Sequence, residues 1–187
     1  MIFLLRHLKT YNNNFGCISG QTDSPILNEN NIIENSNIMK YIDIIYSSPS
    51  KRCLDTLQYI PDLHMEPIID NRLLERNMGD FEGCPRSALY HQYPDLFLNS
   101  NGKIQFRFEL TPPNGDSYSD FSKRISSFCE EVMPFNEECN ILICSHNQTL
   151  KMIYFVLAGI HPSKKDWGKI TFPNGKCITY ALRCKKG

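Results

Sequence analysis

Short apolar runs alternate with helical patterns along this chain, and this alternation restricts its possible folds more than any other feature. The apolar runs have the length of buried strands and cover Ile2–Leu5, Tyr41–Tyr46, Pro67–Ile69, Ile141–Cys144 and Cys177–Leu182. The helical patterns cover roughly Glu29–Lys40, Lys51–Tyr59, Tyr118–Met133 and Thr149–Ala158. Strands that alternate with helices form right-handed crossovers, so the strands become parallel and helices cover both faces of the sheet. The sequence therefore predicts an α/β fold with three layers, α/β/α, around a mostly parallel sheet.

The segment from Glu75 to Pro113 interrupts this alternation. Its prolines and scattered aromatic residues predict an irregular insertion with short helices over one end of the sheet, as in lids and substrate walls. The chain has 187 residues, enough for one substantial core, so we expect residues 1–187 to form a single domain.

The charge balance limits the partners that this chain can have. It contains 20 Lys and Arg residues and 20 Asp and Glu residues, so no general basic surface favours nucleic acid or an anionic membrane. No run approaches the ~20 apolar residues that cross a membrane, and the first residues lack the basic region of a signal peptide. The eight cysteines form no C-x-x-C pair. We therefore expect a cytoplasmic protein with reduced thiols.

Residues that suit anion chemistry follow three of the predicted strands. Arg6 and His7 directly follow the first apolar run, Arg52 opens the helix after the second, and His146 follows Ile141–Cys144. The carboxyl ends of parallel strands meet at the crevice where open α/β sheets bind ligands. Arginine binds oxyanions and imidazole is a nucleophile. Each residue alone has a solvated or structural alternative, but two histidines at two strand ends of one sheet favour a paired role.

A further motif, from Glu75 to Gly83, combines an acidic residue with two glycines around an aromatic side chain. It predicts a tight loop that presents Glu75. The alternative is that Glu75, Asp80 and Glu82 are all solvated.

Taken in order, these pieces resemble the histidine phosphatase superfamily, in the branch that includes cofactor-dependent phosphoglycerate mutase. The resemblance spans nearly the whole chain and implies a phosphoglycerate mutase-like fold. The matching pieces are Arg6-His7-Leu8-Lys9-Thr10, Asn13, Gly20–Leu27, Ser47–Arg52 with Thr56, Glu75–Gly83, Pro113–Ser117 with Arg124, and Ser145-His146-Asn147. In two places the chain departs from the family, because Leu8 and Asn147 stand where the family has glycines after its histidines.

The resemblance also implies a mechanism and a set of site residues. His7 would attack phosphorus to form a phosphohistidine, which water then hydrolyses, and Glu75 would protonate the leaving oxygen and then activate the water. The catalytic residues implied are His7, Glu75 and His146. The phosphate ligands implied are Arg6, Asn13, Arg52 and a protonated His146, with backbone donors at the helix start that carries Arg52. The substrate contacts implied are Lys9, Gln21, Thr22 and Asn147. Neither a metal nor a cofactor is needed.

The length of the chain favours a phosphatase over a mutase. The stretch between the Glu75 loop and Pro113 is shorter than in the mutases, which leaves little room for a diphosphorylated intermediate. The expected partner is a small phosphate ester, such as alpha-ribazole phosphate, a sugar phosphate or a nucleotide. A mutase-type phosphotransferase, a non-catalytic phospholigand-binding protein and a protein phosphohistidine phosphatase remain as alternatives. The oligomeric state stays open between monomer and homodimer.

Overall fold

At the centre of the fold is a five-stranded sheet in the order β3-β2-β6-β1-β7. The computed structural model describes residues 1–27, 32–34, 40–100, 102–132, 134 and 139–180. The strands are β1 (Ile2–Arg6), β2 (Ile44–Ser47), β3 (Ile68–Ile69), β6 (Ile141–Ser145) and β7 (Cys177–Tyr180). The pairs β1·β6, β2·β6 and β2·β3 are parallel, and only the edge strand β7 runs antiparallel, beside β1. The prediction of a mostly parallel sheet is therefore confirmed.

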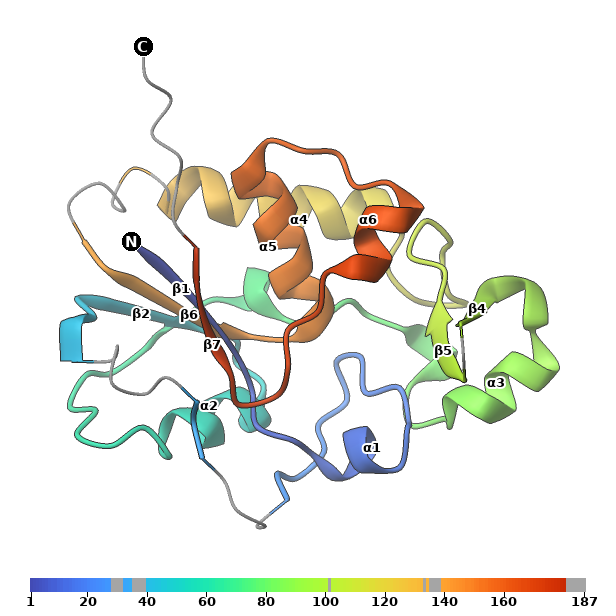
Figure 1. Ribbon diagram of the computed structural model, residues 1–187, viewed down its shortest axis with the longest axis horizontal. Helices are drawn as coiled ribbons and strands as arrows, with labels where there is room; N and C mark the ends of the chain where they lie inside the picture. Colours follow the sequence, from blue (N-terminus) through green and yellow to red (C-terminus); the bar gives the residue numbers. More distant parts are fainter. Residues whose placement is uncertain (28–31, 35–39, 101, 133, 135–138, 181–187) are drawn as a thin grey trace.

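Helices cover both faces of this sheet, as Figure 1 shows. On one face lie α4 (Tyr118–Val132), α5 (Asn147–Ala158) and α6 (Lys164–Lys169), and on the other lies α2 (Lys51–Leu57). The alternation of side chains along β1 explains the two layers, since Ile2 and Leu4 join the core under α4 and α5. Phe3 and Leu5 join the core on the side of α2.

The interrupting segment holds more regular structure than its sequence predicts. It contains the 3₁₀ helices η3 (Gly79–Phe81) and η4 (Pro94–Leu96), the helix α3 (Arg86–Gln92) and a hairpin of β4 (Phe97–Ser100) and β5 (Lys103–Phe106). A small core of its own holds these pieces together, formed by Ile18, Met78, Phe81, Leu89 and Phe97. The hairpin was missing from the prediction because its stability comes from this aromatic cluster, and a two-stranded hairpin is only marginal by itself.

Two smaller elements complete the path around the site, namely α1 (Tyr11–Asn14) and the 3₁₀ helix η2 (Asn71–Leu73). The helix predicted over Glu29–Lys40 falls largely outside the described residues. In the part that is described, Glu34 forms a β-bridge with Lys176, so residues 32–34 are not helical. Among the described helices, none has the length and apolar character needed to cross a membrane.

Candidate active site

A cavity of about 80 Å³ opens at the carboxyl ends of the parallel strands. His7 directly follows β1, His146 directly follows β6, and Arg52 lies in the first turn of α2. Pairing of β1 with β6 continues to the site, because His7 N donates to Ser145 O at 3.0 Å. The sequence-predicted residues that line the cavity are Arg6, His7, Asn13, Arg52, Glu75, His146 and Asn147.

His7 is held as a neutral imidazole with one nitrogen left over for chemistry. Its Nδ1 lies 2.6 Å from Leu8 O, and because a carbonyl only accepts, Nδ1 carries the proton and Nε2 keeps its lone pair. Burial, followed by the charges of Arg6 and Arg52, lowers the pKa of His7 well below its usual 6.5. The side chain can therefore act as a nucleophile at neutral pH.

His146 faces His7, with the two ring centroids 5.2 Å apart in an edge-to-face arrangement. Arg52 Nε donates to His146 Nδ1 at 3.2 Å, so the proton of the neutral ring is on Nε2, which lies 2.9 Å from Ser48 Oγ. Burial and then the nearby charges of Arg52, His7 and Arg6 lower the pKa of His146 well below 6.5. A buried imidazolium would stand beside two guanidinium groups, which favours a neutral His146 here. The expectation of a protonated His146 concerns the site with a phosphoryl group bound and stays a prediction.

The two arginines differ in how much of their hydrogen-bonding capacity remains free. Arg52 donates to the carbonyls of Thr22 and Gly20 at 2.8 and 2.7 Å, and it pairs with Asp23 at 2.9 Å. Arg6 donates from Nη1 to a single carbonyl, that of Phe172, at 2.9 Å, and its buried Nε has no partner among the described residues. A buried donor without a protein partner is rare. Arg6 therefore keeps more unused hydrogen-bonding capacity than Arg52 at the cavity wall.

One of the backbone donors expected to be free at the start of α2 is already used. Lys51 N donates to Asp23 Oδ2 at 2.9 Å. The same carboxylate pairs through Oδ1 with Arg52 Nη1. Asp23 thus occupies the helix start and holds the Arg52 side chain across the cavity wall.

Asn13 reaches the cavity from α1, and its orientation is set by Thr10 N, which donates to Asn13 Oδ1 at 3.3 Å, together with a residue far along the chain. Asn174 Nδ2 donates to Asn13 Oδ1 at 3.1 Å and also to His7 O at 2.9 Å. Because Asn13 Oδ1 is used in this way, its Nδ2 is the atom available as a donor in the cavity. Asn174 lies in the loop before β7, where no sequence motif marked it.

The Glu75 side chain, from the loop after η2, lies against the N-terminus of α5 and accepts hydrogen bonds on both carboxylate oxygens. Oε1 accepts from Arg76 N, Thr149 N and Thr149 Oγ1, each at 3.1 Å, whereas Oε2 accepts only from Gln148 N at 3.2 Å. Arg124 supports the loop by donating to the backbone oxygens of Arg72, Leu74 and Glu75. Glu75 is therefore fixed through Oε1, while Oε2 keeps capacity for another partner.

Three predicted substrate residues are not brought to the cavity. Lys9 is exposed and donates to Asn14 Oδ1 at 2.9 Å. Gln21 N and Thr22 N donate to the carboxylate of Glu82 at 2.9 and 2.7 Å. These contacts hold the loop whose carbonyls accept from Arg52, so Gln21 and Thr22 support the site from behind instead of lining it.

The two departures from glycine have different consequences. Leu8 is 4% exposed and packs in the core on the α2 side. It lines neither this cavity nor the larger one described below. Its N–H donates to Thr56 Oγ1 at 2.8 Å. Asn147 is the first residue of α5 and lines the cavity, with Oδ1 accepting from Phe172 N at 3.1 Å. Only Asn147 therefore changes the surface that a ligand meets.

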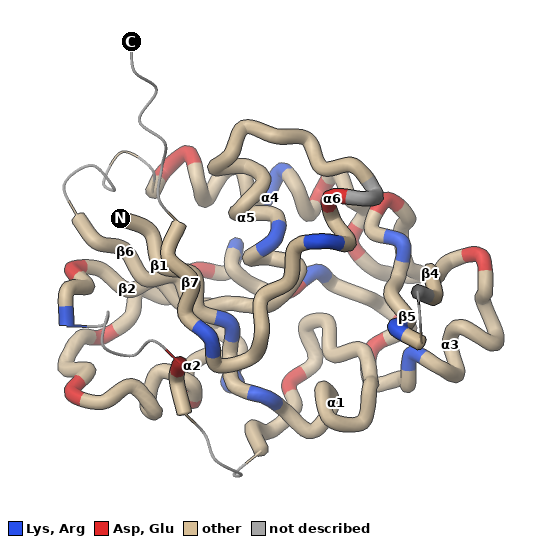
Figure 2. The backbone as a smooth tube through the Cα atoms, in the orientation of Figure 1, with Lys and Arg blue, Asp and Glu red and all other residues tan. Residues whose placement is uncertain are grey.

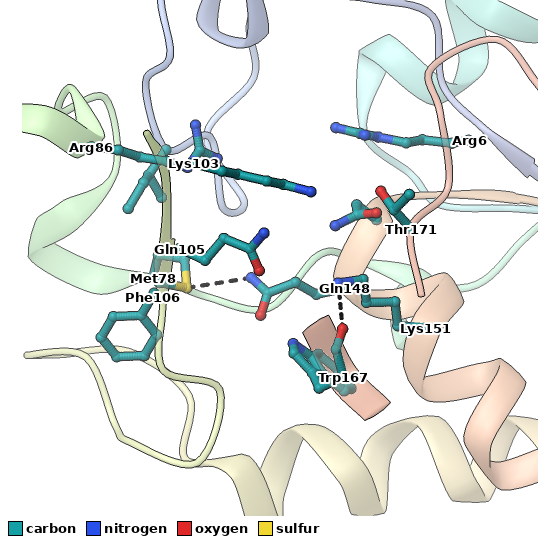
Figure 3. Close-up of a pocket in the computed structure, with 12 residues that line it drawn as sticks. Arg6, Met78, Arg86, Lys103, Gln105, Phe106, Gln148, Lys151, Trp167 and Thr171 are labelled. Atoms are coloured by element: carbon teal, nitrogen blue, oxygen red, sulfur yellow. Dashed lines mark hydrogen bonds between the residues drawn. The ribbon is translucent and has the colours of Figure 1, made fainter. Parts of the chain in front are cut away.

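A larger cavity of about 300 Å³, drawn in Figure 3, adjoins the first one. The residues that line both cavities are Arg6, Ile18, Met78, Arg86, Asn147 and Gln148. Several of its lining residues belong to no motif in the sequence, because they lie in the interrupting segment or on helix faces far from the motifs. Those that carry polar groups are Arg86, Lys103, Gln105, Gln148, Lys151 and Thr171. In the described part of the chain, no group of three His, Cys, Asp or Glu side chains is arranged to hold a metal ion.

Comparisons with known proteins identify relatives of this chain. The family model described as histidine phosphatase superfamily (branch 1) matches residues 2–185. A relative in Hydrogenobacter thermophilus named "Putative phosphoserine phosphatase 2" is 31% identical over 164 residues, which make up 85% of this chain and 79% of that protein. The Escherichia coli protein named "Adenosylcobalamin/alpha-ribazole phosphatase" is 25% identical over 172 residues, or 89% of this chain and 82% of that protein.

The fold is also found among solved structures. The alpha-ribazole phosphatase from Shigella flexneri superposes with a TM-score of 0.72 at 22% sequence identity, covering 94% of this chain and 87% of that one. The two proteins therefore share the same arrangement of strands and helices.

Proposed function

This chain belongs to branch 1 of the histidine phosphatase superfamily and is a phosphatase, and we propose that it hydrolyses a small phosphomonoester through a phosphohistidine on His7, without a metal ion. The observation that carries this proposal is the hydrogen bond from His7 Nδ1 to Leu8 O in a cavity lined by three arginines, Arg6, Arg52 and Arg86. It leaves Nε2 unprotonated in the cavity where a phosphate would bind.

In the first step, His7 Nε2 attacks phosphorus and the bond from phosphorus to the alcohol oxygen breaks. Arg6 and Arg52 neutralise the charge on the phosphoryl oxygens, and Arg6 has donors beyond the Nη1 that Phe172 O holds. Asn13 Nδ2 adds a further donor, whereas His146 accepts from Arg52 Nε through Nδ1 and already uses its N–H on Ser48 Oγ. The low pKa of His7 keeps the nucleophile neutral before the attack.

Glu75 then moves a proton between the reacting groups. We assign Oε2 as the atom that gives a proton to the leaving alcohol and later takes one from the attacking water, since Oε1 is held by three hydrogen bonds. The second step breaks the bond between His7 Nε2 and phosphorus and releases inorganic phosphate, which returns the imidazole to its neutral form.

The partner is a small phosphate ester, in keeping with a site of two adjoining cavities of about 80 and 300 Å³. We propose that the insertion at residues 75–113 forms the outer substrate wall, because the larger cavity is lined by Met78, Arg86, Lys103 and Phe106 from that segment. We also propose a cytoplasmic location, since the described cysteines other than Cys177 are free thiols, as expected in a reducing compartment.

Hydrolysis of p-nitrophenyl phosphate in the presence of EDTA tests the proposal. The wild type is expected to turn over without metal and, on alkaline quenching with a ³²P-labelled ester, to retain label on the protein. His7→Ala should lose at least ~10³-fold in kcat and all of the trapped label, because no other side chain forms the intermediate. Activity that disappears with EDTA, or a His7→Ala rate near that of the wild type, would contradict the mechanism. An inert wild type that still binds phosphate would identify a phospholigand-binding protein instead.

A further inference from the structure

The larger cavity has an unusual charge for its size. Four of its lining residues are cationic, namely Arg6, Arg86, Lys103 and Lys151, and no Asp or Glu lines it. Figure 3 shows the ends of Arg6 and Lys103 pointing toward one another from opposite sides of the cavity. Figure 2 shows that Lys and Arg positions lie on α5 and on β5, the two elements that face each other here. The cavity thus collects positive charge from segments distant in the sequence.

None of these four cations has a carboxylate partner among the described residues. Arg86 donates to the carbonyls of Gly16 and Cys17 at 3.0 and 2.8 Å. Lys151 is 4% exposed, and its Nζ donates to Trp167 O at 2.9 Å. Carbonyl groups fix the directions of these side chains without neutralising them. The Glu75 carboxylate acts favourably on Arg6, Arg86 and Lys151, but it lines the smaller cavity and not the larger one.

The cations are close enough to repel one another. Burial and then the charge of Lys103 lower the pKa of Lys151 to about 8, with Arg6 acting in the same direction and Glu75 opposing it. Burial likewise lowers the pKa of Arg6 to about 10, where the opposing charge of Glu75 is followed by those of Arg86 and Arg52, which lower the pKa further. Like charges gathered in a partly buried cavity are unfavourable by themselves, and an anion between them removes the repulsion.

One phosphate does not account for all four cations. The phosphate site beside His7 is in the smaller cavity, which Arg6 and Arg86 line but Lys103 and Lys151 do not. Lys151 lies one helical turn beyond Asn147 along α5, and Lys103 lies on the hairpin across the opening. Both lysines are therefore placed to meet the part of a substrate that leaves as the alcohol.

We propose that the larger cavity binds a second anionic group, a carboxylate or a phosphate, carried by the alcohol part of the ester, so that the enzyme selects doubly anionic substrates. This proposal rests on the proposed function. Lys103 and Lys151 bind the second anion, and Gln105 and Gln148 supply neutral donors beside it. The absence of acidic side chains in the lining disfavours alcohols that carry a cationic group at the same place.

Two matched series of esters test this selectivity. The first compares glycerol 3-phosphate with 3-phosphoglycerate and glycerol 1,3-bisphosphate, and the second compares glucitol 6-phosphate with 6-phosphogluconate and glucitol 1,6-bisphosphate. Within each series only the terminal group changes, from a neutral CH₂OH to a carboxylate or a phosphate. In at least one series, the ester with a charged terminal group should have a kcat/KM about tenfold or more above that of the neutral ester. This is the factor expected from one charge-assisted hydrogen bond to the second anion. The two charged members separate carboxylate from phosphate.

The lysine variants connect that preference to the cavity. Lys103→Gln, on an exposed position of β5, and Lys151→Met should each reduce the preference at least several-fold while p-nitrophenyl phosphate turnover changes much less. Lys123→Gln, on an exposed position of α4 outside the cavity, is the matched control and should keep the full preference. Because Lys103 is exposed, its replacement tests the proposal even if Lys151→Met fails to fold.

Equal kcat/KM values for neutral and charged esters in both series would overturn the inference, as would a preference that survives both lysine substitutions. Either result leaves the proposed function intact as long as p-nitrophenyl phosphate is hydrolysed. A wild type that hydrolyses neither this ester nor any member of the two series would reject the proposed function itself.

Discussion

Asn174 Nδ2 lies 3.1 Å from Asn13 Oδ1 and 2.9 Å from His7 O, so one amide connects the loop before β7 to the nucleophile and to a neighbouring donor. The two carbonyl oxygens that it reaches, of His7 and Leu8, can only accept, which identifies the shared atom as the nitrogen. Asn174 is therefore a positioning residue that orients Asn13 without touching the substrate.

We expect Asn174→Ala to lower kcat/KM for p-nitrophenyl phosphate about tenfold, because Asn13 loses the contact that directs its Nδ2 into the cavity. Asn174→Asp should lower kcat/KM further. An aspartate carboxylate has no N–H, so its oxygens would face three other acceptor oxygens, those of His7, Leu8 and Asn13. In a double-mutant cycle, Asn174→Ala should have little further effect in an Asn13→Ala background. The exposed Asn14→Ala is the control, and additive losses in the cycle would show that Asn174 acts only on general stability.

Glu75→Gln should distinguish proton transfer from structural support. The loss in kcat/KM should be at least ~100-fold for an alkyl phosphate and much smaller for p-nitrophenyl phosphate, whose leaving group needs little protonation. Glu82→Gln provides the comparison, because Glu82 holds the loop at Gln21 and Thr22 and does not line the cavity. It should affect both esters equally. Equal losses for Glu75→Gln would remove it as the proton donor.

The pKa values of His7 and His146 predict how stability depends on pH. Both are lowered in the fold, mainly by burial, so below about pH 6.5 the unfolded chain binds protons that the folded chain does not. The stabilisation that comes from keeping the two histidines neutral should be fully present above this pH. It should then fall as the pH drops toward the lower folded-state values, by up to ~1.4 kcal/mol per pH unit for each histidine.

Urea denaturation at pH 7.5 and 5.5 measures this effect. The double variant His7→Gln/His146→Gln should lose most of the difference between the two pH values, whereas replacing the exposed His64 by Gln should keep it. Stability that stays constant, or rises, on acidification of the wild type would contradict the assignment of two neutral histidines.

Gly20 and Gly16 form a matched pair for the loop that holds Arg52. Both have a positive φ, +52° and +68°, but a Cβ at Gly16 meets open space, whereas one at Gly20 lies 2.0 Å from Glu82 Oε1. Gly16→Ala should therefore lower the free energy of unfolding only by the strain of a positive φ, about 1 kcal/mol. Gly20→Ala should cost at least about 2 kcal/mol, because the methyl group also displaces the Glu82 carboxylate from its hydrogen bonds. Thermal or urea denaturation of the two variants tests the difference, and equal costs would contradict it.

The sequence by itself determined the architecture and the main strand-end residues. Apolar runs of strand length and the helices between them are local signals, so the parallel sheet and the positions after β1 and β6 could be predicted from spacing alone. Even there, the antiparallel direction of β7 and the hairpin of β4 and β5 were not predicted, because pairing direction and aromatic packing depend on residues distant in the chain.

Only the tertiary structure decided the protonation of His146, the support of Asn13 by Asn174, and the loss of Lys9, Gln21 and Thr22 as cavity residues. Each depends on which donors and acceptors are already used by neighbours from other segments, and a linear motif does not carry that information. The charge of the larger cavity is the strongest example. Arg86, Lys103 and Lys151 look like ordinary solvated cations in the sequence, and only folding brings them together around one space with no acidic side chain between them.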